Sequence, residues 1–278
     1  MVDVASPKNL FVAFLVASIA TILVSPKAAA QPEQWPNLGS GASAWSGIGG
    51  GEFIAIPGGP APVSQDSRYA RVANAQSLIT GEQANYRISD VTNPNLMQWA
   101  REVMQQDNEE VLAGKIAFSP RSTCSPGGIP GFILMGGGGM HVLQTADQVV
   151  MIHEGDGQMR RIHLNVPHSE NSEPSWYGDS VGHYEGDTLV VDTIGLNDRS
   201  FVDAYRTPHT ENLHVVERWR LVDDGEVLEV HVTGTFVQPW QALRRFRREV
   251  RPLEEMRCAE NNEQFYSGFM PIADSFDF

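Results

Sequence analysis

The stretch that most restricts the fold runs from Met140 to Val250, where short apolar or alternating segments are separated by residues typical of turns. Three turns are marked by Gly155-Asp156-Gly157, Glu185-Gly186-Asp187 and Asp223-Asp224-Gly225. Glycine beside aspartate supplies the positive φ that a tight hairpin needs. We therefore predict eight strands, at residues 140–144, 148–154, 158–164, 180–184, 188–194, 213–221, 227–236 and 242–250.

These segments follow one another mostly in hairpin order, with no helices between them to connect parallel strands. The pattern predicts a mainly β fold, an antiparallel eight-stranded meander barrel of the lipocalin (calycin-like) type. Such a barrel either holds one small ligand or is filled by its own side chains. A two-sheet β-sandwich is the alternative, because a strand count does not separate the two architectures.

Residues 1–30 have the pattern of a signal peptide. The apolar run Leu10–Val24 follows Lys8 and precedes Ala28 and Ala30, which fit the small-residue cleavage rule. An uncleaved membrane anchor is the alternative, but the run is short for a bilayer span. We therefore predict cleavage near Ala30, a periplasmic or secreted protein, and no stable membrane anchor after cleavage.

Composition divides the rest of the chain into three parts. Residues 31–93 are rich in Gly and Pro and are predicted to form an extended arm on the barrel. Residues 94–139 begin with a helix at about 94–113, with Asn93 as its N-cap, and continue as a loop that packs on the barrel. Residues 140–278 form the barrel core and a C-terminal tail. The sequence predicts no oligomeric state.

The chain is acidic and contains two cysteines. Its formal net charge of −14 at pH 7 disfavours nucleic acid and anionic lipid as partners. Cys124 and Cys258 are the two cysteines, and in an oxidising compartment two cysteines commonly pair. We predict a Cys124–Cys258 disulfide, with two unpaired buried thiols as the alternative.

The segment from Trp176 to Thr193 reads W-x-G-D-S-x-G-x-Y-E-G-D-T-L-V-V-D-T. It resembles the signature of a family of uncharacterised exported bacterial proteins, and supporting matches extend over residues 140–262. The resemblance implies export and a shared fold, but no activity. A likeness to lipocalins rests on the predicted topology alone and implies no function.

Residues two apart in a strand share a face, so alternation sorts each predicted strand into an inner and an outer side. In the strand at 213–221, the residues that share a face with Glu217, including Trp219, are apolar, which places this carboxylate inside the barrel. A buried carboxylate is either paired with a cation or has a raised pKa suited to acid–base catalysis. Glu217 is therefore either structural, with an inward arginine as its partner, or catalytic.

The same sorting places Glu154 and Arg160 inside, across the turn at 155–157, where they would form an ion pair. It also assigns Asp192 to the interior, near the end of the barrel. The alternative to a functional role is a hydrogen-bonded polar network that fixes the strand register. The candidates for substrate binding are Arg160, Glu154, Arg218, Trp176, Trp219 and Tyr184.

Four histidines lie in or next to the predicted loops at 165–179 and 195–212: His168, His183, His209 and His214. Because the hairpin at 180–194 lies between these loops, we expect the histidines to gather with Asp179 at one mouth of the barrel. Histidine and aspartate in a mouth of this kind suit acid–base catalysis. The spacing contains no HExxH, HxH or paired CxxC motif, so neither a metal nor another cofactor is predicted.

Together these features predict an exported β-barrel protein that acts on a small organic molecule. The leading hypothesis is metal-independent acid–base chemistry of the lyase, hydratase or isomerase type, with Glu217 or a mouth histidine as the base and Arg160 or Arg218 stabilising negative charge. A non-catalytic, lipocalin-like ligand carrier is the first alternative. A metal-dependent hydrolase that uses the mouth histidines is the second.

Overall fold

The structure is a computed structural model that describes residues 36–39, 41, 43–69, 72, 76, 79–80, 87–115, 120, 124–134, 139–154, 157–236 and 238–250. Within these ranges the helix is α2 (Gln98–Leu112), and short 3-10 turns lie at Gly131–Leu134 and Asp223–Gly225. The strands are β1 (Ser43–Gly47), β2 (Ile54–Ala55), β3 (Met140–Gln144), β4 (Gln148–His153), β5 (Met159–Leu164), β6 (Asp179–Glu185), β7 (Thr188–Ile194), β8 (His214–Val222), β9 (Val227–Phe236) and β10 (Gln238–Val250).

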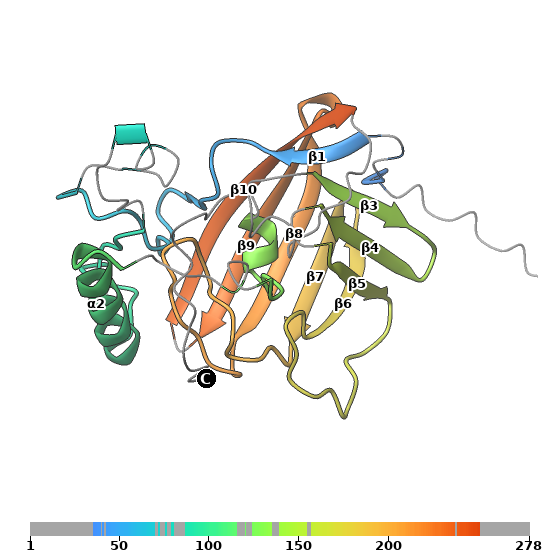
Figure 1. The fold of residues 1–278 in the computed structure, drawn as a ribbon. Coiled ribbons are helices and arrows are strands. Elements are labelled where there is room, and N and C mark those ends of the chain that lie inside the picture. The colour runs from blue at the N-terminus through green and yellow to red at the C-terminus, as the bar shows by residue number, and fades with distance from the viewer. Residues whose placement is uncertain are drawn as a thin grey trace, which may run out of the picture. The chain divides into compact units, whose positions relative to one another are not determined.

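Nine of the described strands form a closed barrel in the order β1-β3-β4-β5-β6-β7-β8-β9-β10 (Figure 1). The ring closes because β10 also pairs with β1, and β2 adds a short edge to β10. The predicted mainly β barrel is confirmed over the sandwich alternative. The predicted count of eight strands is wrong, because the Gly- and Pro-rich arm contributes β1 as a ninth.

β1 closes the barrel between strands from opposite ends of the β region. It pairs along its length with the end of β10, from Ser43–Val250 to Gly47–Phe246, and Trp45 pairs with Met140 of β3. Trp45 is fully buried, and the guanidinium of Arg248 lies 4.3 Å from the centre of its ring. One buried tryptophan in a short strand therefore anchors β1 between β10 and β3, where the barrel closes.

β5 and β6 form the parallel pair of the barrel. They pair only at His163–Val181 and Leu164–Gly182, and residues 165–178 connect them without a helix. The predicted antiparallel meander is therefore wrong at this step, although the other pairs in the ring are antiparallel. A long irregular connection can reach a parallel neighbour without the helix that usually makes such a crossover.

The barrel interior is filled by its own side chains. In β8 burial alternates as predicted, with Val215, Glu217 and Trp219 fully buried. In β4 the inward residues are Val149 and Met151, which lie on the face opposite to that of Glu154. The prediction that the Glu154 face is the inner one is therefore wrong. Four consecutive apolar residues in β4 give alternation no polar residue by which to choose a face. Large inward side chains include Trp45, Met140, Met151, Trp219 and Phe246.

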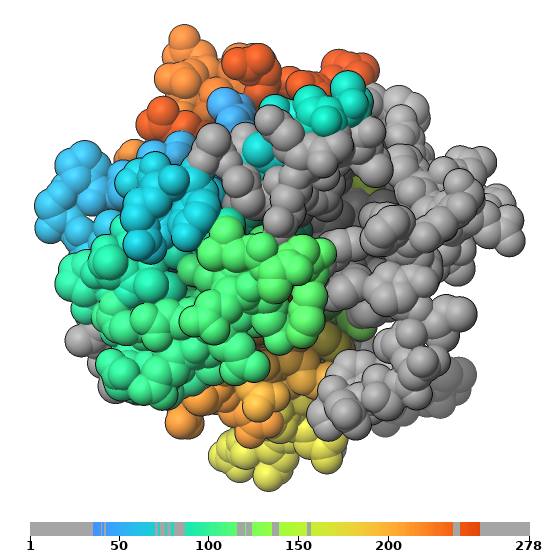
Figure 2. Space-filling view, turned by 60° about the vertical axis from the view of Figure 1, so that its left-hand side comes forward, coloured from blue at the N-terminus to red at the C-terminus, as the bar shows by residue number. Residues whose placement is uncertain are grey.

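Helix α2 begins at Gln98, four residues later than predicted. Asn93 does not cap it: the Asn93 side chain accepts a hydrogen bond from the Asn95 N–H at 2.8 Å and closes a separate turn before the helix. Ala100 and Met104 on α2 pack against Tyr205 from the loop between β7 and β8. Figure 2 shows α2 in green with arm residues in cyan beside it.

Some predictions fall outside the described residues. Residues 1–30, predicted to be a signal peptide, and Cys258 lie outside the described ranges. Cleavage near Ala30 and the Cys124–Cys258 disulfide therefore stay predictions. The described residues belong to one compact unit, Trp35–Phe278. No helix within the described ranges has the length and apolar character needed to span a bilayer.

Candidate functional site

The barrel interior contains a fully buried ion pair between Arg160 of β5 and Glu217 of β8. Arg160 Nη1 donates a hydrogen bond to Glu217 Oε2 at 2.7 Å, and neither side chain has exposed surface. Trp219 Nε1 donates to the same carboxylate oxygen at 2.8 Å. Arg160 Nη2 donates to Thr193 Oγ1 at 3.0 Å and to Ser180 Oγ at 3.3 Å. The geometry favours the structural interpretation of Glu217, with Arg160 as the inward arginine.

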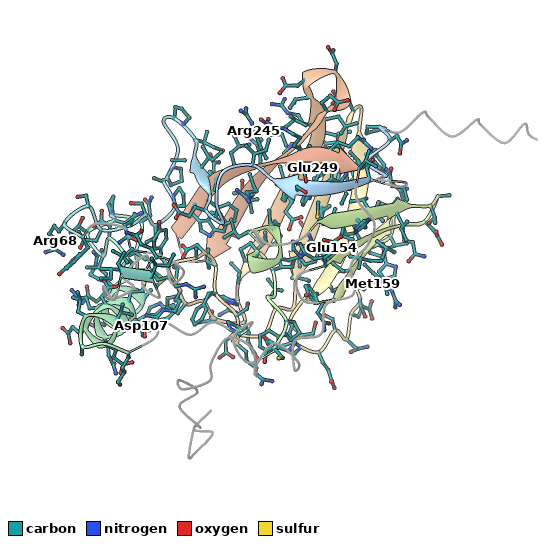
Figure 3. All side chains as sticks on the ribbon, turned by 45° about the horizontal axis from the view of Figure 1, so that its top comes forward. Arg68, Asp107, Glu154, Met159, Arg245 and Glu249 are labelled. Carbon is teal, nitrogen blue, oxygen red and sulfur yellow. The ribbon has the colours of Figure 1, made fainter. Side chains whose placement is uncertain are left out.

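A cleft opens in the barrel wall where β5 and β6 diverge, and we call it the β5–β6 cleft. Its volume is about 710 Å³ including the open mouth. The two strands pair only at the end of β5, so the first residues of β5 and the residues just before β6 lie apart. Met159, which is labelled in Figure 3, is one of its lining residues. The lining residues are Met159, Arg161, His163, Tyr177, Gly178, Asp179 and Ser180.

Two histidines and two aspartates form a continuous chain of contacts that ends at this cleft, and we call it the His–Asp chain. His214 Nε2 lies 2.8 Å from Asp192 Oδ1, and the same oxygen lies 3.0 Å from His168 Nε2. His168 Nδ1 lies 3.1 Å from Asp179 Oδ2, which also accepts a hydrogen bond from the Ser169 N–H at 2.7 Å. Asp179 lines the cleft, so the chain connects the cleft to partly exposed residues.

The contacts of the His–Asp chain restrict which of its members can donate a hydrogen bond. An ionised carboxylate only accepts hydrogen bonds, and a histidine ring donates from both nitrogens only when it carries two protons. His168 contacts a carboxylate oxygen with each nitrogen, so both contacts are hydrogen bonds only when the ring carries two protons or one of the two carboxyl groups is protonated. Asp179 Oδ1 accepts no hydrogen bond from another described residue.

Two basic side chains on the outer face of β5 line the same cleft. Arg161 and His163 alternate with the inward Arg160 and Ile162, and both are exposed. Neither makes an ion pair or a side-chain hydrogen bond with another residue that the structure describes. The cleft therefore combines a carboxylate with two basic groups that lack a partner in the described part of the chain, which suits a small organic anion.

The expected cluster of mouth residues is formed in part. His168, His214 and Asp179 come together, and Asp192 joins them from the outer face of β7, not from the interior as predicted. In β7 the inward residue beside Asp192 is Thr193, which binds Arg160. All of β7 up to Val191 is buried on both faces, so alternation did not reveal which face is inner.

His183 lies elsewhere, on the exposed outer surface. Its Nε2 lies 3.1 Å from Glu185 Oε1, and Arg218 Nη2 donates a hydrogen bond to Glu185 Oε2 at 2.6 Å. The hydrogen bond from Arg218, followed by that from His183, lowers the pKa of Glu185. The three side chains form a surface group of ordinary charge pairs, and Arg218 does not reach the cleft.

His209 is buried apart from the other histidines. Ser200 Oγ lies 2.9 Å from His209 Nε2, and His209 Nδ1 lies 3.1 Å from the Thr210 carbonyl oxygen. The carbonyl only accepts, so Nδ1 carries the proton and Nε2 accepts from the Ser200 hydroxyl. Burial lowers the pKa of His209. Neither residue lines the β5–β6 cleft.

Glu154 does not pair with Arg160 as predicted. Its Oε2 accepts a hydrogen bond from the Gly139 N–H at 2.6 Å and its Oε1 lies 3.0 Å from His141 Nε2. Arg160 points inward to β8, while Glu154, labelled in Figure 3, follows the end of β4. The error arises from the wrong phase of β4.

The remaining aromatic candidates make structural contacts. The Tyr184 hydroxyl accepts a hydrogen bond from Gln144 Nε2 at 2.6 Å, and burial raises the pKa of Tyr184. The ring of Trp176 lies under the guanidinium of Arg199, at 5.0 Å from the ring centre. Neither residue lines the β5–β6 cleft, which takes its aromatic side chain from Tyr177.

Sequence reasoning missed the cleft residues Arg161 and His163, and it missed the contacts of Asp192. A signal for the first two was present, because Arg161 and His163 occupy the face of β5 opposite to Arg160. Their gathering with Asp179 depends on the parallel pairing of β5 and β6, which the sequence did not indicate.

Neither the arrangement of possible metal ligands nor similarity to known proteins identifies the function. Among the described residues, no group of three or more His, Cys, Asp and Glu side chains is arranged to hold a metal ion. No protein-family profile matches the chain, and no curated protein matches it. The likeness of the segment from Trp176 to Thr193 to exported bacterial proteins stays a prediction.

Proposed function

We propose that this protein performs metal-independent acid–base chemistry on a small organic anion bound in the β5–β6 cleft. The reaction type is that of a lyase, hydratase or isomerase, and Asp179 is the base. The observation that carries the proposal is that the His–Asp chain ends at Asp179 in the cleft, beside Arg161 and His163, two basic side chains with no partner among the described residues. We include export in the proposal, because the signal-peptide pattern of residues 1–30 supports it.

The substrate class follows from the charges that line the cleft. Arg161 presents a planar guanidinium, which binds a carboxylate through two parallel hydrogen bonds. His163 adds a second donor when it is protonated. A small molecule held by Arg161 through its carboxylate would place its neighbouring carbon near Asp179, since both residues line the same cleft.

The chemical step is a proton transfer from carbon. Asp179 removes a proton from the carbon next to the carboxylate or carbonyl, and the electron pair of the C–H bond moves into an enolate. Arg161 stabilises the negative charge on the enolate oxygens. The proton returns at another position in an isomerase, or the electron pair expels a leaving group in a lyase. His168 is a positioning residue: its Nδ1 orients Asp179, and its Nε2 is held in turn by Asp192.

The two other hypotheses have less support. A lipocalin-like carrier needs room inside the barrel, and here the interior holds Trp45, Trp219 and Phe246 together with the Arg160–Glu217 pair. A metal-dependent hydrolase needs several ligands around one point, and the described residues offer no such group.

Binding and turnover test the proposal together. The full chain is incubated with acetate, lactate, pyruvate and malonate as probes, and both line broadening and new signals are followed by NMR. Arg161→Gln should weaken binding by about 10- to 100-fold, because it removes a charged hydrogen-bond donor. Asp179→Asn should abolish turnover while the probe still binds.

Arg218→Gln is the matched control, because Arg218 is an arginine on the outer barrel face whose partner is Glu185. It should leave both readouts unchanged. Equal effects of Arg161→Gln and Arg218→Gln would contradict a specific anion site in the cleft. Unchanged turnover in Asp179→Asn would remove Asp179 as the base.

A further inference from the structure

The β5–β6 cleft has an apolar part as well as a charged one. Met159 and Tyr177 line it together with Arg161, His163 and Asp179. Met159 is 48% exposed, although its side chain is large and apolar. The proton transfer proposed above uses the charged residues, so the apolar pair has no part in that step.

Arg161 and Asp179 lie at the same level on opposite walls of the cleft. Each precedes by two positions a residue of the first β5–β6 pair, His163–Val181, and the two strands run in the same direction. The two side chains line the cleft without forming an ion pair with each other. A ligand between the walls therefore meets a cation on one side and a carboxylate on the other.

Met159 and Tyr177 occupy the next level, toward the end at which the strands diverge. Met159 precedes Arg161 by two positions on β5, and Tyr177 precedes Asp179 by two positions on the other wall. Residues two apart in a strand are separated by roughly 6.5 Å along it. The cleft therefore passes from a charged level to an apolar level within about the length of a small molecule.

Packing and a close backbone approach hold the Tyr177 wall in place. The Tyr177 ring meets the ring of buried Phe132 edge-on, with the ring centres 5.8 Å apart and the planes at 86°. Gly178 has φ +59°, and a Cβ added to it would lie 2.3 Å from the Ile194 carbonyl oxygen. The aromatic wall is therefore ordered before a ligand arrives, which lowers the entropic cost of binding.

The free space in the cleft suits a ligand larger than the smallest carboxylic acids. A small molecule can occupy about 370 Å³ of it, and small-molecule sites measure roughly 300–1,000 Å³. An apolar group placed between Met159 and Tyr177 would remove apolar surface from water on three sides, which favours binding. Thioethers make favourable contacts with aromatic rings, so Met159 suits an aromatic group in particular.

We infer that the β5–β6 cleft takes a carboxylate that carries an aromatic substituent, with the carboxylate on Arg161 and the ring between Met159 and Tyr177. The carbon that joins the two groups then lies beside Asp179. The inference rests on the proposed function and narrows its substrate class from small organic anions to arylalkyl carboxylates.

The test compares 3-phenyllactate, lactate and malate, titrated into the full chain by calorimetry at pH 7.5. The three probes share a 2-hydroxycarboxylate, and their third carbon carries a phenyl ring, hydrogen only or a second carboxylate. Phenyllactate should bind about 10- to 100-fold more tightly than lactate, because its ring is buried. Phenyllactate that binds no more tightly than lactate, or malate that binds at least as tightly as phenyllactate, would overturn the inference.

A change at Met159 tests the position of the ring. Met159→Ser should reduce the preference for phenyllactate over lactate by about three- to tenfold and leave lactate binding unchanged. Leu143→Ser is the matched control, because Leu143 is an apolar side chain of β3 that is 53% exposed and does not line the cleft. Met159→Ser protein with the full preference, or an equal loss in Leu143→Ser, would refute the assignment of the ring.

Arg161→Gln distinguishes failure of the inference from failure of the proposed function. It should weaken phenyllactate and lactate by the same factor and keep their ratio, because both probes share the carboxylate. Equal binding of the two probes to wild type, with both weakened in Arg161→Gln, would refute the aromatic substituent and leave the anion site in place. Binding of no probe, or no effect of Arg161→Gln, would remove the anion site and the inference together.

Discussion

Replacing Glu217 by glutamine tests whether the barrel is built around its internal ion pair. The change keeps the size of the side chain but removes the charge that faces Arg160 at 2.7 Å, where neither side chain has exposed surface. An arginine left without its counter-ion in a closed interior destabilises the fold by about 3–5 kcal/mol. We therefore expect a large loss of folding free energy.

Urea unfolding measures this loss directly. For a slope at the upper end of about 1–3 kcal/mol/M, the midpoint should fall by roughly 1–2 M. Removing both partners, in Arg160→Met/Glu217→Leu, should cost less than Glu217→Gln alone, since no charge is left buried. Trp219 Nε1 would still lose its acceptor, at a cost of about 1–3 kcal/mol.

Glu185→Gln is the control for this prediction. It removes a carboxylate that also pairs with an arginine, Arg218, but on the exposed surface, so it should lower the folding free energy far less than Glu217→Gln does. A Glu217→Gln protein as stable as the Glu185→Gln protein would refute the reasoning. It would mean that Arg160 is not held in the interior by this carboxylate.

Three further outcomes are expected. Burial acts to raise the pKa of Glu229, but hydrogen bonds from three basic side chains outweigh it and hold the pKa at about 2. The stability that this carboxylate gives the folded chain is therefore complete above pH 4.5 and is lost as the pH falls towards 2. Glu229→Gln should remove this loss from the acid unfolding curve. Burial lowers the pKa of His209, so the folded chain should lose stability as the pH falls below about 6.5, and His209→Gln should flatten that part of the curve. Gly178→Ala should cost about 2–5 kcal/mol, because φ is +59° and a Cβ would lie 2.3 Å from the Ile194 carbonyl oxygen. Gly186→Ala, at φ +61° in open space, should cost only about 1–2 kcal/mol in the same denaturation assay.

The sequence predicted those parts of the fold that depend on local patterns. Alternation in β8 placed Glu217 inside, and the Gly–Asp turns placed the hairpins. The assignment of inner and outer faces failed in β4, where both faces carry apolar residues. Alternation of polar and apolar residues then does not show which face is the inner one. The sequence also failed to predict β1, since Ser43–Gly47 is too short and too rich in small residues to be recognised before its partners are known.

The candidate site depended on contacts that no local pattern contains. His168, His214 and Asp179 were identified by residue type, but their meeting with Asp192 follows from the strand order β6-β7-β8. The partner of Arg160 lies across the barrel, 57 positions away in sequence.

Hydrogen exchange at carbon tests the proposed chemistry most directly. The full chain is incubated in D2O with lactate, pyruvate and malonate, and the loss of the C–H signals beside the carboxylate or carbonyl group is followed by proton NMR. Asp179 as base predicts deuterium in at least one of these compounds, lost in Asp179→Asn and kept in the turn variant Asp187→Asn. Binding of these anions without any deuterium incorporation, or equal incorporation in Asp179→Asn, would contradict acid–base catalysis in the β5–β6 cleft.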